Sequence, residues 1–249
     1  MYTNADSLRN KLDELKIRIL NATYKPKVIC ITEFKVKNTG NSNIEMIEYN
    51  LEGYNLFHNN DTKNCHRGVL IYVDKGLAAV PMDYGQAFAE NIFIRIKAHE
   101  NNYVLLGCIY RSPNSTKLNN NALLELLDGI QYNSFCSVII VGDFNLPDIN
   151  WKFPSTVNTQ GYSCEFIKRI EDNYLHQMVQ EPTRGRAGQR SNILDLILTN
   201  EENSVDNIVY EAPLGKGDHS VINFRIKIDC EAEVPKQLSI CMIKQILKT

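Results

Sequence analysis

The sequence has no excess of charge of either sign, since 27 basic and 29 acidic residues leave a net charge of −2. Bulk attraction to a polyanion is therefore weak, and any contact with DNA must come from a local patch. The seven cysteines are widely spaced, odd in number and contain no CxxC pair. This pattern argues against a zinc site and favours a reducing, intracellular compartment.

Long hydrophobic runs are also missing. The opening residues, MYTNADSLRNKLDELK, contain neither the basic nor the apolar region of a signal peptide, and we expect no membrane span. There is no internal repeat and no low-complexity linker. At 249 residues, of which 43% are hydrophobic, one soluble domain is the default expectation. We place it at residues 1–230, followed at 231–249 by a Lys-rich tail that is a short helix or disordered.

Hydrophobic patterning predicts about ten short strands and three helices. The predicted helices are one that is capped near Asp6 or Ser7 and ends near Asn21, Leu118–Ile130 and Gly161–Asn173. The main predicted strands are Lys27–Thr32, Tyr54–His58, Gly68–Val73, Ile92–Ala98, Tyr103–Tyr110, Val138–Val141, Ile193–Asn200, Asn207–Glu211 and Ser220–Ile228. Many short strands with few helices favour two packed sheets with helices outside over a series of βαβ units.

The segment VIIVGDFNLPD, residues 138–148, carries polar groups at the end of an apolar run. We expect Gly142 to break the strand and to deliver Asp143 and Asn145 at its end, where mixed α/β folds collect their ligands. Taken alone, these residues could equally be turn formers.

Other strand ends carry acids or amides as well: Asn4 with Asp6, Glu33, and Asp218 with His219. If these groups share one rim with Asp143, they form an oxygen-rich site of the kind that Mg²⁺ prefers. The substrate would then be a phosphate ester.

Asp195 lies inside the apolar run ILDLILTN, where an ionised carboxylate is costly unless a donor satisfies it. His219 could be that donor, and the pair would orient the imidazole for proton transfer or charge stabilisation. The alternatives are that Asp195 faces water on an edge strand and that His219 is a solvated turn histidine.

Tyr110 ends its predicted strand and could hydrogen-bond a phosphoryl oxygen, although half-buried packing would explain it equally well. The loop PTRGRAGQRSN contains three arginines and no acid, which suits either contact with a phosphate backbone or an ordinary solvated loop. The expected DNA-binding residues are Arg111, Arg184, Arg186 and Arg190.

Seven segments, taken in order, resemble the endonuclease/exonuclease/phosphatase superfamily, and most closely the apurinic-type endonuclease domain of non-LTR (LINE-type) retrotransposons. They are TNADSLRNKLDEL, ICITEFK, RGVLIYV, GCIYRSPNS, VIIVGDFNLPDINW, VQEPTR followed by SNILDLILTN, and KGDHSVI. The resemblance implies a four-layer α/β sandwich of two mainly antiparallel sheets flanked by helices. It also implies a monomeric enzyme without membrane contact that nicks DNA with Mg²⁺, or with Mn²⁺ in its place, and that needs access to the nucleus.

The resemblance implies a role for each candidate. The principal metal ligand would be Glu33, assisted by Asp6 and Asp218. Asn4 and Tyr110 would complete a ring of groups that bind the phosphate.

The same resemblance assigns the handling of water to Asp143, which would align or deprotonate the attacking molecule with Asn145 beside it. His219 would stabilise the transition state and would be oriented by Asp195. These roles match what phosphoryl transfer requires of a protein, namely positioning and charge neutralisation.

The chain departs from the family pattern at three places, two of which are Phe34 where threonine is common and Gly217 where serine is common; the third is its first strand. Only residues 1–3 precede Asn4, where family members have a longer first strand, so we expect Asn4 and Asp6 to be held loosely. In a full element a reverse transcriptase would follow, and this chain contains none. The alternatives are therefore an inactive nucleic-acid-binding relic and a phosphomonoesterase or phospholipase of the same superfamily.

Overall fold

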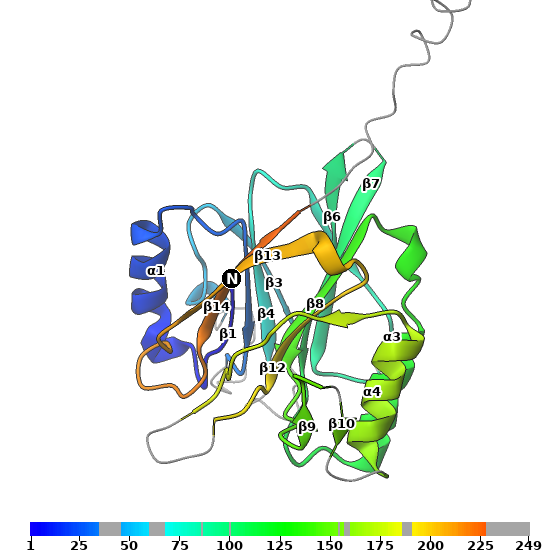
Figure 1. Cartoon of the computed structure of the whole chain (residues 1–249). Coiled ribbons are helices and arrows are strands. Elements are labelled where there is room, and N and C mark those ends of the chain that lie inside the picture. The colour runs from blue at the N-terminus through cyan, green and yellow to red at the C-terminus, as the bar shows by residue number, and fades with distance from the viewer. Residues whose placement is uncertain are drawn as a thin grey trace, which may run out of the picture.

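The computed structural model describes residues 1–34, 46–59, 68–85, 87–99, 101–153, 155–156, 160–185 and 191–227. The tail expected at residues 231–249 and the domain boundary at residue 230 lie outside these ranges, as do Arg186 and Arg190. The described residues fold into two six-stranded sheets and one two-stranded ribbon, with helices on both outer faces of the sheet pair (Figure 1).

The first sheet has the strand order β13-β14-β1-β2-β4-β3. Its strands are β1 (Tyr2–Asn4), β2 (Val28–Thr32), β3 (Tyr54–Asn59), β4 (Val69–Asp74), β13 (Val205–Glu211) and β14 (Val221–Ile226). Within this sheet only β1 and β2 run parallel, since helix α1 (Leu12–Asn21) carries the chain back between them. Helix α1 packs on the outer face of this sheet, to the left in Figure 1.

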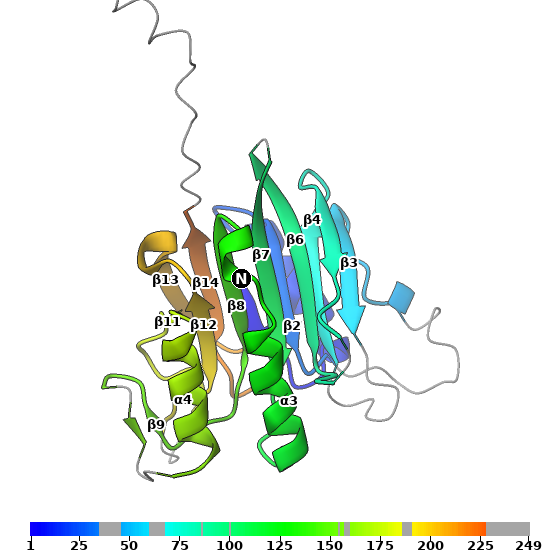
Figure 2. The same ribbon diagram turned by 90° about the vertical axis from the view of Figure 1, so that its right-hand side faces the viewer.

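The second sheet has the order β11-β12-β8-β7-β6-β5. Its strands are β5 (Ala79–Met82), β6 (Asn91–His99), β7 (Asn102–Tyr110), β8 (Ser137–Asp143), β11 (His176–Gln177) and β12 (Asp195–Thr199). Helix α3 (Lys117–Asp128) connects the parallel pair β7 and β8, and α4 (Tyr162–Asp172) packs beside it, as Figure 2 shows. The remaining elements are β9 (Ile149–Asn150), β10 (Ser155–Thr156) and the 3-10 turns Arg9–Lys11, Tyr132–Ser134 and Glu202–Ser204.

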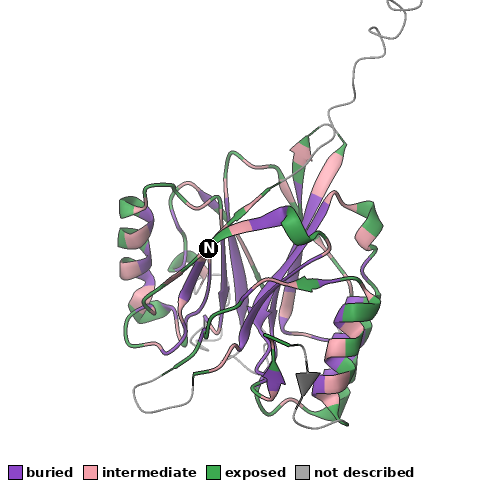
Figure 3. Ribbon diagram, in the orientation of Figure 1, coloured by how far each residue is buried: buried purple, intermediate pink, exposed green. Residues whose placement is uncertain are grey.

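Three hydrophobic cores separate the layers. The core between the sheets contains Ile71, Cys108 and Ile197, and a second core lies between α1 and the first sheet. The third joins the second sheet to α3 and α4 and includes Phe144 and Phe166. Figure 3 shows the corresponding pattern, with buried strands and helices that are buried only on their inner sides. The four-layer α/β sandwich expected from the sequence is thereby confirmed.

The start of the first helix differs from the expectation. Asp6 and Ser7 do not cap α1, which begins at Leu12 after a 3-10 turn and has no side-chain cap. Both residues have positive φ angles, of 38° and 76°. Their backbone N–H groups are used elsewhere, since that of Asp6 donates to the Asn4 side chain and that of Ser7 to the carbonyl of Glu33. The cap prediction was wrong because this turn serves the neighbouring strand ends.

Gly142 does not break its strand, because β8 continues through it to Asp143. A Cβ atom at Gly142 would lie 2.0 Å from the carbonyl oxygen of Ile109 on β7. Glycine is needed here for the close approach of two backbones, and alanine would force β7 and β8 apart at the end that carries Asp143.

The short first strand is firmly held. Although β1 has only three residues, it lies between β14 and β2, and Tyr2, Thr3 and Asn4 are all buried. The expectation that Asn4 is loose is therefore wrong, since pairing on both sides compensates for the small length of the strand.

Candidate active site

Strands from both sheets end at one rim of the sandwich. Asn4 ends β1 and Glu33 directly follows β2 in the first sheet, while Asp143 ends β8 and Asp195 begins β12 in the second. In the second sheet Asp143 is the register partner of both Tyr110 and Asp195. The site residues predicted from the sequence, which come from both sheets, therefore lie at the same rim of the sandwich.

Asn4 joins the two sheets at this rim. Its Nδ2 donates to Glu33 Oε1 and to Asp143 Oδ2, both at 2.9 Å. Its Oδ1 accepts the backbone N–H of Asp6 at 2.9 Å, so the turn at Asp6 is fixed by the same side chain. Asn4 is only 3% exposed. The buried amide of Asn4 therefore bonds directly to both carboxylates and keeps them adjacent.

Asp195 and His219 form a buried pair. His219 Nδ1 lies 2.7 Å from Asp195 Oδ2, and the Tyr2 hydroxyl donates to Asp195 Oδ1 at 2.7 Å. Neither Asp195 nor His219 faces solvent, because they are 0% and 4% exposed, and the alternatives of an edge-strand aspartate and a solvated histidine are therefore wrong. His219 Nε2 lies 3.9 Å from Asp143 Oδ2 and 4.0 Å from Asp218 Oδ1. The imidazole thus lies among three carboxylates.

The charges around His219 favour its protonated form. Burial alone would lower the pKa of His219, but the charge of Asp195, its hydrogen bond, and the charges of Asp143 and Asp218 together raise that pKa to about 9. At neutral pH the ring is an imidazolium whose Nδ1–H donates to Asp195. Its Nε2–H then faces Asp143 and Asp218.

The surroundings of Asp143 disfavour its charged form, because it is a buried carboxylate near other carboxylates. Burial and the charges of Asp195 and Glu33 raise its pKa to about 7, against the opposing effects of His219 and the hydrogen bond from Asn4. A carboxylate with a pKa near neutrality can both accept and release a proton under physiological conditions.

The donor set suits a hard divalent cation. Among the described residues, one group of three possible ligands has its atoms within 4.8 Å of one another, namely Asp143, Asp195 and His219. His219 is protonated, and the oxygens of both carboxylates accept hydrogen bonds, those of Asp195 from Tyr2 and His219 and those of Asp143 from Asn4 and the backbone N–H of Asn145. Of the two, Asp143 shares the Asn4 amide with Glu33, so it lies beside a further carboxylate that could bind the same cation. A cation here would relieve the repulsion that raises the pKa of Asp143.

The expected ligands Asp6, Glu33 and Asp218 do not form a second such group within the described ranges. The side chain of Asp6 is exposed at the rim, and that of Asp218 accepts a hydrogen bond from Arg184 Nε at 3.1 Å. Asp6 and Glu33 have φ angles of 38° and 52°. Left-handed backbone at residues other than glycine is uncommon and clusters at functional sites.

Arg111 does not have the position expected of a DNA contact. It is 5% exposed and donates to Asn120 Oδ1 at 2.9 Å and to the carbonyls of Phe144 and Asn145 at 3.1 and 3.0 Å. Asn145, with a φ of 50°, returns a hydrogen bond from Nδ2 to the Arg111 carbonyl at 2.9 Å. The guanidinium also lies 4.7 Å from the centre of the Tyr162 ring. We reassign Arg111 as the clamp that fixes the turn after Asp143.

The segment EPTR supports the site through hydrogen bonds to the backbone beside Asp195 and His219. The Thr183 hydroxyl oxygen accepts the backbone N–H groups of Leu194 and Asp195, each at 3.1 Å, and the Thr183 carbonyl accepts that of Ser220 at 2.8 Å. Thr183 thus ties the strand of Asp195 to the turn of His219, a role that the sequence analysis missed. Within the described part of this loop, Arg184, whose side chain is 44% exposed, contacts Asp218 at the site.

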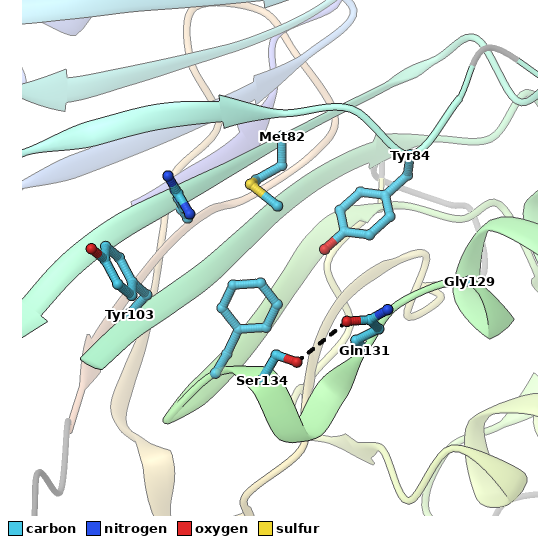
Figure 4. A pocket seen from close by; sticks show the side chains of 8 residues that line it. Met82, Tyr84, Tyr103, Gly129, Gln131 and Ser134 are labelled. Carbon is cyan, nitrogen blue, oxygen red and sulfur yellow. Dashed lines mark hydrogen bonds between the residues drawn. The ribbon is translucent and has the colours of Figure 1, made fainter. Parts of the chain in front are cut away.

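Tyr110 is 5% exposed and belongs to the core between the sheets. Well away from the rim, a hollow of about 450 Å³ lies between β5, β6, β7 and the turn after α3 (Figure 4). It is lined by Met82, Tyr84, Arg95, Tyr103, Gly129, Gln131, Ser134 and Phe135, none of which is a candidate site residue.

No helix in the described ranges is long and apolar enough to cross a membrane.

Residues 104–223 match a family model described as endonuclease-reverse transcriptase. No curated protein sequence matches the chain.

Solved structures share the fold over nearly the whole chain. The endonuclease domain of TRAS1, a telomere-specific non-LTR retrotransposon, has a TM-score of 0.66 at 17% identity and covers 92% of this chain and 99% of its own. The AP endonuclease LMAP from Leishmania major has a TM-score of 0.69 at 13% identity, covering 91% and 87%. An endonuclease/exonuclease/phosphatase family protein from Leptotrichia buccalis has a TM-score of 0.59 at 17% identity, covering 91% and 98%.

These identities are low, so the structural matches establish the fold alone, while the family model adds a sequence match over β7 to β14. Both agree with the resemblance carried by the seven sequence segments. The chain therefore has the fold of the endonuclease/exonuclease/phosphatase proteins, and its residues 104–223 are similar in sequence to an endonuclease-reverse transcriptase family.

Proposed function

We propose that this protein is an Mg²⁺-dependent endonuclease that hydrolyses DNA phosphodiester bonds. The observation that carries the proposal is the pair of carboxylates bridged by Asn4, Glu33 and Asp143, next to the imidazolium of His219. Acidic oxygens, a base with a pKa near 7 and a fixed cationic donor are the parts that phosphodiester hydrolysis requires. DNA is proposed as the substrate because solved structures with this fold include AP endonucleases and a retrotransposon endonuclease domain.

In this mechanism Asp143 accepts a proton from the attacking water as the new bond from oxygen to phosphorus forms. The bond from phosphorus to the 3′ oxygen breaks, and that oxygen takes a proton from solvent, leaving a 3′-hydroxyl and a 5′-phosphate. His219 donates from Nε2 to a phosphoryl oxygen, where negative charge develops, and Asp195 keeps the ring in position. Asn145 would hold the water or a phosphate oxygen, and Tyr110 would donate to another.

Glu33 is the proposed principal ligand of the ion, with Asp6 and Asp218 at the same rim. The bound ion would supply neutralisation of charge on the phosphate and on the leaving oxygen. Asn4 contributes by keeping Glu33 and Asp143 adjacent.

DNA would be held by a local patch, since the net charge of the chain is −2. Arg184 is the proposed phosphate contact, because it lies beside Asp218 and its side chain is 44% exposed. Arg186 and Arg190 remain proposed contacts in the same loop.

One reason for the inactive-relic alternative is the short first strand. The contacts of Asn4 speak against that reason, because Asn4 is buried and binds two carboxylates. The phosphomonoesterase alternative has one comparison in its favour, since a 3′ phosphatase from Neisseria is among the solved structures with this fold.

To test the proposal, the purified full chain is incubated with Mg²⁺ and, in parallel reactions, with supercoiled plasmid, p-nitrophenyl phosphate or an inositol phosphate. We expect nicked circles that a DNA polymerase extends without further treatment, and no phosphate from the two monoesters. Phosphate release without nicking would establish the phosphomonoesterase. Salt-sensitive DNA binding without turnover would establish the relic.

The nicking rate should depend on pH as a bell-shaped curve. Asp143 must be ionised, so the rate rises as pH passes its pKa of about 7, and His219 must be protonated, so the rate falls as pH passes about 9. A bound cation would move the rising limb to lower pH, because positive charge favours the carboxylate. Initial rates between about pH 5.5 and 10, with circular dichroism as the folding control, measure this. A rate that still increases between pH 9 and about pH 10 would show that neutral His219 suffices.

A further inference from the structure

Tyr2 is a core residue whose hydroxyl reaches a carboxylate of the other sheet. It lies on β1 in the first sheet, is 0% exposed, and donates from Oη to Asp195 Oδ1 on β12 in the second sheet at 2.7 Å. The ring packs in the core between the sheets, which fixes where the hydroxyl can go. A buried tyrosine hydroxyl needs a partner, and this one has the carboxylate that binds His219.

The hydroxyl belongs to a chain of hydrogen bonds. Thr32 Oγ1 lies 3.2 Å from Tyr2 Oη, and since the single hydroxyl hydrogen of Tyr2 goes to Asp195, Thr32 is the donor of that pair. His219 Nδ1 donates to the other oxygen of Asp195. Thr32 directly precedes Glu33, so the chain connects the proposed metal side of the rim to the imidazole.

Two donors on opposite oxygens fix the plane of the Asp195 carboxylate. With only His219 bound, the carboxylate could rotate about its Cβ–Cγ bond and its second oxygen would be buried with one partner fewer. Burial and the charge of Asp195 raise the pKa of Tyr2 well above its ordinary value, so the hydroxyl remains a donor throughout the range in which the enzyme would work.

We propose that Tyr2 is a positioning residue for catalysis, which acts by holding Asp195 in the orientation that aligns His219. This inference rests on the proposed nuclease function, since Tyr2 itself touches neither substrate nor ion. The competing explanation is that the hydroxyl is only a satisfied polar group of the core.

The Tyr2→Phe variant separates the two explanations when it is paired with Tyr72→Phe. Tyr72 is equally buried, in β4 of the same sheet, and its hydroxyl donates to the Tyr49 carbonyl at 2.5 Å in the core beneath α1, on the other face of that sheet. We expect Tyr2→Phe to lower kcat for nicking about 10-fold with little change in KM, because a hydrogen bond to a charged group is lost. Tyr72→Phe should keep the kcat of the wild type.

In an Asp195→Asn background, Tyr2→Phe should have no further effect on kcat, because the two residues act as one unit. Thr32→Val, which removes the donor to Tyr2, should lower kcat in the same direction by a smaller factor, and it serves as the second variant if Tyr2→Phe does not fold. Equal kcat values for Tyr2→Phe, Tyr72→Phe and the wild type, or full additivity with Asp195→Asn, would overturn the proposal.

A second readout needs no catalysis. In the resting protein, the Nδ1 proton of His219 should give a slowly exchanging NMR signal in the wild type and in Tyr72→Phe, and a broadened or absent signal in Tyr2→Phe. An unchanged signal would overturn the positioning role of Tyr2. If the wild type did not nick DNA at all, the proposed function would fail while this signal still decided the role of Tyr2.

Discussion

Asp143→Asn should lower the nicking rate by about 10³-fold or more, because an amide cannot accept the proton of the attacking water. Asparagine can keep the bond from Asn4 only in part, but it retains the size of the buried side chain. The matched control is Asp148→Asn, which changes a carboxylate five positions further along the same segment, where it accepts a hydrogen bond from Ser163 at 2.8 Å. That control should nick at the rate of the wild type.

The same substitution should not weaken the fold. The folded protein keeps the proton of Asp143 up to a pKa of about 7, against an ordinary 3.8, so ionisation of Asp143 reduces the free energy of unfolding as pH rises across that window. Asparagine carries no such cost. In metal-free solution at about pH 8, the melting temperature of Asp143→Asn should equal or exceed that of the wild type. An unfolded variant, or a folded one that nicks normally, would contradict the role of Asp143.

His219→Ala should lower the nicking rate by roughly 10² to 10³-fold, the effect expected when one donor to a developing oxyanion is removed. The falling limb of the pH profile should disappear with it. His176→Ala, which removes an exposed histidine on β11, is the control. It should retain both the nicking rate of the wild type and the fall of that rate at high pH.

The stability effect of His219→Ala has the opposite sign. Because the folded pKa of His219 is about 9 against an ordinary 6.5, the imidazolium contributes stability that is fully present below pH 6.5 and is lost as pH rises through 9. The decrease in melting temperature from the wild type to the variant should therefore be larger at about pH 6 than at about pH 10. Equal losses at both pH values would show that His219 is not held as a cation.

The strands that carry the site could be predicted because they are strongly patterned. The apolar run at 138–141 is β8, and the run around Asp195 is β12, so the cost of burying that carboxylate pointed correctly to a partner at His219. The rim itself followed from acids at several strand ends. These inferences needed only local sequence and the energetics of burial.

The supporting contacts could not be predicted, because they join residues far apart in the chain. Tyr2 lies 193 residues from Asp195, and a three-residue strand has no periodicity to indicate its burial. Arg111 seemed an exposed loop cation, yet its acceptors are backbone carbonyls 33 and 34 positions away. Thr183 was missed although its segment EPTR was noticed, since a hydroxyl that binds backbone N–H groups leaves no compositional signal.

In the proposed nuclease, the carboxylates of the rim hold a divalent cation that DNA cleavage requires. The most direct measurement is single-turnover nicking of supercoiled plasmid by metal-free protein after addition of Mg²⁺, with the wild type and Glu33→Gln side by side. The wild type should nick only after Mg²⁺ is added, and Glu33→Gln should need at least about 10-fold more Mg²⁺, because one charged ligand is lost. Nicking by the wild type in EDTA, or the same Mg²⁺ dependence in both proteins, would contradict this role of the carboxylates.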